Sequence, residues 1–158
     1  MNAILIVALS GSLRAASTNT ALLRAVAESA PAGISVEILP LNKLPLFNPD
    51  LDNSLPDAVT RFRGKVGQAD GMIIASPEYA HGISGVLKNA LDWLVGYEGF
   101  AGKPVQVLNA APRAKHGVAA LREVLVTMSA QLIDEHPHST RDDRLALVQL
   151  LSSKGTLS

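Results

Sequence analysis

Residues 3–19 read AILIVALSGSLRAASTN, and they contain the most informative pattern of the chain. The apolar run from Ala3 to Ala8 predicts a buried strand that ends in the turn Ser10-Gly11-Ser12. From Thr20 onward, apolar residues recur at the spacing of an amphipathic helix. A strand, a polar loop and a helix in that order form the first unit of an α/β fold.

The same alternation continues along the chain and predicts a parallel sheet. We expect further strands at 34–39, 71–75 and 105–109, and further helices at 58–66, 84–95 and 117–128. A fifth strand at 132–133 and a last helix at 141–151 are both expected to be short. Helical crossovers between parallel strands cover both faces of a sheet, so residues 1–158 are predicted to form one three-layer domain.

Composition limits what the chain does. Its 158 residues are 47% hydrophobic with a mean hydropathy of +0.22, and no apolar run approaches the roughly 18 residues of a membrane span. We expect a soluble, cytoplasmic protein, because the N-terminus lacks the basic region and cleavage site of an export signal. Fourteen basic residues balance fourteen acidic ones without a basic stripe, which argues against a nucleic-acid partner. The chain has no cysteine, so any redox chemistry must come from a bound cofactor.

The loop after the first strand has the features of a phosphate site. Open α/β sheets bind ligands at the carboxyl ends of their strands, and the start of the following helix offers free N–H groups and a favourable dipole to an anion. This loop lacks both the lysine of a triphosphate-binding loop and the G-x-G-x-x-G pattern, so a terminal monophosphate is predicted. Helix capping would explain one of its polar residues but not the whole set, which is Ser12, Arg14, Ser17, Thr18 and Asn19.

The loop after the third strand reads SPEYAHG at 76–82 and suits a planar ligand. Pro77 stiffens this turn and Gly82 relaxes it, so that backbone amides can line a flat heteroaromatic ring.

Three segments together carry a resemblance to a known family: GSLRAASTN at 11–19, LPLFNPDL at 44–51 and SPEYAHGISGVLKNALDWL at 76–94. They resemble the NADPH-dependent FMN reductases, which include bacterial quinone, chromate and azo-dye reductases. The resemblance implies a flavodoxin-like sandwich with strand order 2-1-3-4-5. It also implies FMN as cofactor and NADPH or NADH as co-substrate. The expected reaction is a ping-pong hydride transfer to a small acceptor such as a quinone, an azo dye, chromate or free flavin.

The resemblance also assigns residues to the cofactor. The first loop should bind the FMN phosphate through Ser12, Arg14, Ser17 and Asn19, with Thr18 beside them. The ring and ribityl chain should follow Pro77, Glu78, Tyr79 and Ala80. The family often has asparagine where Ala80 stands, so a side-chain contact should be missing there while backbone contacts remain. No catalytic side chain is assigned, because the cofactor supplies the chemistry.

A third loop, at 110–117, lies where many members of that family carry a glycine-rich turn against the ring. Ala111, Pro112 and Arg113 are therefore assigned to the cofactor, although Arg113 or Lys115 could instead meet the 2′-phosphate of NADPH. The resemblance further implies a homodimer or homotetramer.

Other features receive plainer interpretations. The cluster at 134–143, which contains His136 and His138, is read as a solvated turn rather than a metal site. Trp93 is expected in the core or an interface, and Lys88 should pair with Asp92 on a helix surface. Two alternatives to a reductase stay open: an electron-carrying flavodoxin, although such carriers are strongly acidic and this chain has zero net charge, and a non-catalytic flavin-binding or regulatory protein.

Overall fold

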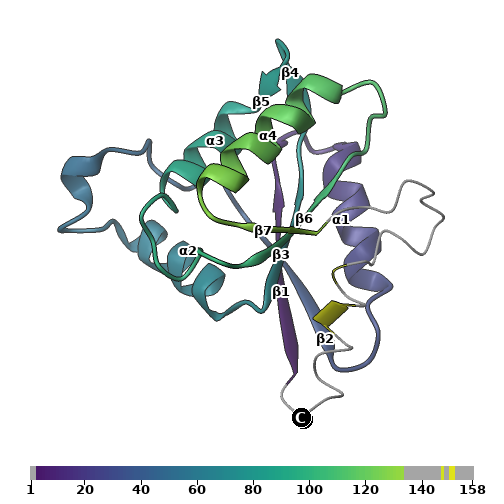
Figure 1. Ribbon diagram of the computed structural model, residues 1–158, viewed down its shortest axis with the longest axis horizontal. Coiled ribbons are helices and arrows are strands. Elements are labelled where there is room, and N and C mark those ends of the chain that lie inside the picture. Colours follow the sequence, from purple (N-terminus) through teal and green to yellow (C-terminus); the bar gives the residue numbers. More distant parts are fainter. Residues whose placement is uncertain (1–2, 134–146, 148–149, 152–158) are drawn as a thin grey trace.

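The computed structural model describes residues 3–133, 147 and 150–151, and a five-stranded parallel sheet forms its centre (Figure 1). The strand order is β2-β1-β3-β6-β7, which confirms the predicted 2-1-3-4-5 arrangement. The last strand has three residues and is short, as expected. The strands are β1 (Ile4–Ser10), β2 (Ile34–Leu39), β3 (Gly71–Ala75), β6 (Pro104–Leu108) and β7 (Gln131–Ile133).

Helices connect these strands, and their ends follow local capping chemistry. Ser17 caps α1 through its side chain, so the helix begins at Thr18, two residues before the apolar pattern. The helix predicted to reach residue 95 ends at Asp92, in a turn that leads to Gly96 at φ +73°. The helices are α1 (Thr18–Glu28), α2 (Asp57–Gln68), α3 (Gly85–Asp92), α4 (Lys115–Thr127) and the short 3₁₀ helix η1 (Pro49–Leu51).

Alternate residues of each strand face opposite layers. From β1, Val7 and Leu9 belong to a core that includes buried residues of α2, α3 and α4. Ile6 and Ala8 face the other way and pack with Leu23 of α1. Figure 1 shows α1 on one side of the sheet and α2, α3 and α4 on the other, so the fold is a three-layer sandwich.

Leucines from the C-terminal part complete the α1 layer. Leu147, Leu150 and Leu151 are helical, and Leu147 and Leu151 are buried in that core. The rest of the helix predicted at 141–151, and the predicted solvated turn with His136 and His138, lie outside the described residues. Within the described ranges, no helix is long and apolar enough to cross a membrane.

Candidate functional site

The three loops chosen from the sequence begin at one edge of the sheet. In the register of the central strands, Ser10 of β1 is the partner of Ala75 of β3, and Ala75 is the partner of Leu108 of β6. Each of these residues ends its strand. The loops that follow therefore start side by side at the carboxyl edge, where open α/β sheets bind ligands.

Gly11 brings the first two loops into close contact. Its amide donates to the carbonyl of Ala75 over 2.8 Å. A Cβ atom on Gly11 would lie 2.4 Å from the hydroxyl of Ser76 and 2.9 Å from the hydroxyl of Ser84. Because real Cβ atoms do not approach other atoms so closely, glycine is required here. No local pattern predicts this role, because the contacts join Gly11 to residues 65 and 73 positions away; the only signal in the sequence is a glycine directly after a buried strand.

The first turn of α1 offers hydrogen-bonding groups that the protein does not use. Ser17 Oγ accepts from the amide of Thr20 over 3.1 Å, and the first helical bond runs from the amide of Ala21 to the Ser17 carbonyl. The amides of Thr18 and Asn19 precede that bond and point out of the helix end. Asn19 Oδ1 is buried and has no partner within the described part of the chain. An orphaned amide oxygen of this kind costs free energy unless a ligand or water meets it.

The remaining residues of the first loop complete a short polar cradle. Ser12 Oγ accepts from the amide of Arg14 over 3.3 Å, and the hydroxyls of Ser10 and Thr20 bond over 2.7 Å below it. The Arg14 side chain is exposed, as is Thr18. Two free amides, the side-chain amide of Asn19 and a nearby guanidinium fit an anion that also carries hydroxyl groups. The donor set therefore fits the phosphate and ribityl end of FMN.

The second loop, predicted as a turn at 76–82, is a tight hairpin. Strand β4 (Glu78–Tyr79) pairs with β5 (Gly82–Ile83), and the two residues between them, Ala80 and His81, have φ of +49° and +61°. Two successive left-handed residues make a type I′ geometry, which is strained for residues other than glycine, asparagine and aspartate. Pro77 and Gly82 flank this turn, and neither one takes the left-handed conformation.

Side chains of the second loop attach it to the start of α4. Glu78 Oε2 accepts from the amide of Gly117 over 2.6 Å, so its carboxylate satisfies the first turn of a helix that has no side-chain cap of its own. The ring of His81 stacks on that of His116 with centroids 4.1 Å apart. The sequence assigned Glu78 to the cofactor, but the structure directs its carboxylate to α4. Tyr79, in contrast, is 60% exposed.

The first part of the third loop is exposed and is held by local bonds, whereas Gly117 at its end bonds to Glu78. Ala111, Pro112 and Arg113 all lie at the surface. The amide of Ala111 donates to Asn109 Oδ1 over 2.9 Å, and the amide of Ala114 donates to the Ala111 carbonyl. The stack of His116 on His81 joins this loop to the hairpin, so the second and third loops meet at the start of α4.

The segment 44–51 is held by α3, a role that the sequence analysis did not assign. The side-chain amide of Asn89 accepts from the amide of Phe47 over 2.8 Å and donates to the Pro45 carbonyl over 3.0 Å. Trp93, fully buried as predicted, donates to the same carbonyl through Nε1 and meets the ring of Phe47 edge-on. Between these anchors, Leu46 is 83% exposed. The predicted Lys88–Asp92 pair is present at 2.7 Å.

A side chain with a shifted pKa lies at the opposite edge of the sheet. Burial lowers the pKa of Lys103, just before β6, and the nearby Asp70 carboxylate partly opposes this shift. Among the residues that the structure describes, no three histidine, aspartate or glutamate side chains gather as metal ligands. The carboxyl edge thus offers hydrogen-bond donors and the cations of Arg14, Arg113 and Lys115.

Comparisons with known proteins agree with this geometry. Residues 4–140 match the family model described as NADPH-dependent FMN reductase. The chain is 38% identical over 139 residues to an NAD(P)H-dependent FMN reductase of Pseudomonas aeruginosa, which covers 84% of this chain and 72% of that protein. It is 33% identical over 144 residues to a 2-hydroxy-1,4-benzoquinone reductase of a Burkholderia species, covering 84% and 79%. A solved flavoenzyme NAD(P)H:(acceptor) oxidoreductase of Paracoccus denitrificans has the same fold, with a TM-score of 0.73, 24% identity, and coverage of 95% and 92%.

Proposed function

The chain belongs to the NADPH-dependent FMN reductase family, and from this we propose that it reduces small quinones with NAD(P)H through FMN held at the carboxyl edge of its sheet. It is an FMN-dependent oxidoreductase, and the comparisons give no support to an electron carrier or a non-catalytic protein. The observation that carries the placement of the cofactor is the cradle between β1 and α1, where two backbone amides and the buried Asn19 Oδ1 lack partners within the described part of the chain.

The first loop binds the phosphate in this proposal. The amides of Thr18 and Asn19 donate to phosphate oxygens, and the exposed guanidinium of Arg14 balances their charge. Ser12 and Ser17 hold the loop in shape through their hydroxyls, which already accept backbone bonds. Their hydroxyl protons stay available to the phosphate. The Asn19 side chain either accepts from a ribityl hydroxyl or turns its NH₂ group to the phosphate.

The second and third loops form the wall along the ring. FMN held there would supply the hydride transfer from NAD(P)H to the acceptor. Pro77, Tyr79 and Ala80 line the ring through backbone groups, while Glu78 fixes the hairpin on α4 and so acts as a positioning residue. Ala111 and Pro112 border the ring, and Arg113 or Lys115 meets the 2′-phosphate of NADPH. No side chain acts as an obligate acid or base.

A homodimer or homotetramer in the cytoplasm completes the proposal. Exposed large apolar side chains support self-association: Leu46 is 83% exposed, and Val95 and Val126 are more than half exposed. The natural acceptor is a small molecule. The balanced charge of fourteen acidic and fourteen basic residues argues against binding to nucleic acid.

Anaerobic spectroscopy tests the function. The purified chain is reconstituted with FMN, reduced with NADPH and then mixed with benzoquinone. We expect bound oxidised flavin to bleach with NADPH and to return with the quinone. If FMN binds but NADPH leaves it oxidised, the reductase function is wrong; if no flavin is retained at micromolar concentration, the cradle assignment is wrong.

A further inference from the structure

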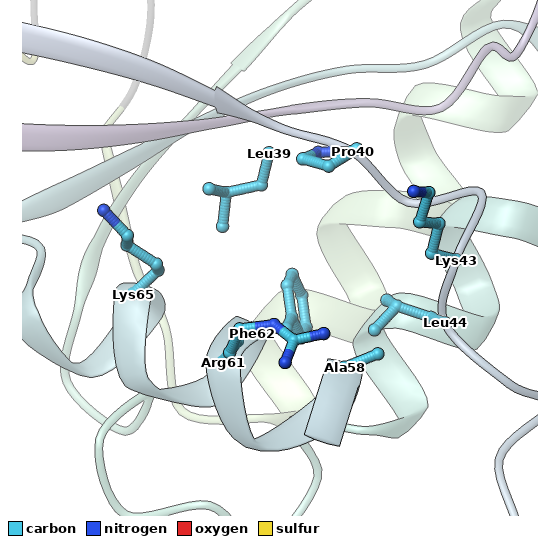
Figure 2. Close-up of a pocket in the computed structure, with 8 residues that line it drawn as sticks. All are labelled: Leu39, Pro40, Lys43, Leu44, Ala58, Arg61, Phe62 and Lys65. Carbon is cyan, nitrogen blue, oxygen red and sulfur yellow. The ribbon is translucent and has the colours of Figure 1, made fainter. Parts of the chain in front are cut away.

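A cavity of about 220 Å³ lies between the end of β2 and α2, outside the three loops described above (Figure 2). Its floor is apolar: Leu39 and Phe62 are buried, and Leu44 and Ala58 are half-buried beside them. Its rim is cationic, and Figure 2 shows Lys43, Arg61 and Lys65 around the opening. An apolar floor under a ring of charge is the arrangement of a ligand site rather than of a packing defect.

Two of the three charges on the rim, those of Lys43 and Arg61, are not neutralised within the described part of the chain. None of the described residues that line the cavity is acidic. Lys65 bonds to Glu37 Oε2 over 2.9 Å, so its charge is balanced. Lys43 and Arg61 are exposed and have no hydrogen-bond or ion-pair partner in the described part of the chain. Within the described residues, the side chains of Lys43 and Arg61 are therefore unpaired cations above an apolar floor. No sequence pattern predicts this pair, because the two residues come from separate segments.

We propose that this cavity binds a small carboxylate that carries a single aromatic ring or a short alkyl chain. The apolar part covers Leu39 and Phe62, and the carboxylate meets Arg61 and Lys43. The ligand must be small, because the cavity is below the roughly 300–1,000 Å³ of sites for drug-sized molecules. A bare inorganic anion would leave the floor uncovered, and a neutral ring would leave the cations unpaired.

The proposed site does not depend on the reductase function, and it shares one residue with a segment that α3 anchors. Leu44 lines the cavity and also opens the segment 44–51, which Asn89 and Trp93 hold against α3. A bound acid would therefore contact this anchored segment without entering the FMN cradle.

A titration followed by NMR tests the proposal on the ¹⁵N-labelled full chain. The probe is 3-phenylpropionate, and 3-phenylpropanamide is its uncharged control. We expect saturable amide shifts clustered around Leu44, Arg61 and Phe62 with the acid, weaker binding at high salt, and at least threefold weaker binding of the amide.

Matched variants separate this site from general attraction to a cation. Arg61→Gln and Lys43→Gln should each weaken binding about threefold to fivefold, whereas Arg24→Gln, which removes an exposed charge from α1 on the other face, should not change it. Ala58→Met fills the cavity while keeping every charge, and it should abolish the clustered shifts. The ¹⁵N spectrum itself reports whether each variant is folded. The proposal is overturned if no saturable shift appears at about 10 mM acid, or if folded Ala58→Met binds like the parent chain.

Discussion

The first and second loops at the carboxyl edge are built on opposite principles. The loop between β1 and α1 leaves polar groups without partners, among them the buried Asn19 Oδ1. In the hairpin after β3, the Glu78 carboxylate already has a partner in the protein, the amide of Gly117. The hairpin backbone is strained at Ala80. The difference indicates that the first loop is prepared to bind, whereas the hairpin is a fixed wall that shapes the space beside it.

The contact that joins these two regions gives the largest expected effect. Gly11→Ala places a Cβ atom against Ser76 and Ser84, and this overpacking should lower the free energy of unfolding by about 1–3 kcal/mol and prevent FMN binding. Urea denaturation and quenching of FMN fluorescence measure the two losses. Gly64→Ala, where nothing lies within 4 Å of the new atom, is the control and should be neutral or slightly stabilising. Equal stability of the two variants would contradict the close approach.

The wall itself is tested by removing its attachment. Glu78→Ala takes the carboxylate from the first turn of α4 and should destabilise the protein by about 1–3 kcal/mol, because the amide of Gly117 loses a charged acceptor. Glu78→Gln keeps an acceptor and should lose roughly half as much. Denaturation curves of both variants give the comparison, and FMN affinity should change little in Glu78→Gln. A large loss of FMN affinity in that variant would place the carboxylate in the cofactor site instead.

Much of the fold follows from local patterns in the sequence. The run at 71–75 is buried throughout and becomes β3 with the predicted bounds, because a strand covered on both faces needs five apolar or small residues in succession. The apolar pattern also predicted α1, although the side-chain cap at Ser17 makes the helix begin at Thr18, two residues before that pattern. The order of the strands came from the resemblance rather than from the patterns, since parallel strands pair through contacts distant in sequence.

The parts of the site that escaped prediction depend on such distant contacts. Asn89 binds the backbone of Phe47 across 42 residues, and nothing near either residue signals this bond. Ala80 and His81 form a type I′ turn although neither residue favours it, so propensity pointed to the flanking Pro77 and Gly82. Tertiary anchoring through Glu78 and His116 overrides that local preference.

Substitution of Asn19, whose buried Oδ1 is unpaired in the described part of the chain, should lower FMN affinity without lowering stability. Asn19→Leu removes a buried acceptor that has no partner, so the flavin-free protein should lose no stability and could gain about 1 kcal/mol. FMN affinity should fall about tenfold, because one hydrogen bond to the cofactor is lost. Unfolding without flavin and FMN titration measure the two effects, with the exposed Asn53→Leu as control. A loss of stability without a loss of affinity would make Asn19 structural.

Because the hairpin is strained at Ala80, a glycine at this position should raise stability, although glycine usually lowers it. Ala80→Gly relieves the left-handed conformation at φ +49° and, after the entropy of glycine is counted, should raise stability by about 0.5 kcal/mol. Ala119→Gly, the same substitution at an exposed position within α4, should lower stability by about 1 kcal/mol. Thermal unfolding of the two variants measures the opposite signs. Destabilisation by both would show that Ala80 is not strained.

Among the substitutions in the first loop, that of Arg14 should have the smallest effect on FMN affinity and the most specific one. Its side chain is exposed, so solvent screens its charge, and Arg14→Gln should weaken FMN binding by only about threefold to fivefold. Riboflavin has the same ring and ribityl chain without the phosphate, and its affinity should not change. The loss for FMN should shrink as salt rises, because screening already weakens an exposed pair in the parent chain. Arg24→Gln removes an equally exposed charge from the middle of α1 and should leave both affinities unchanged. An equal loss for FMN and riboflavin would move Arg14 from the phosphate to the ring, and the first loop would then share the role of the wall.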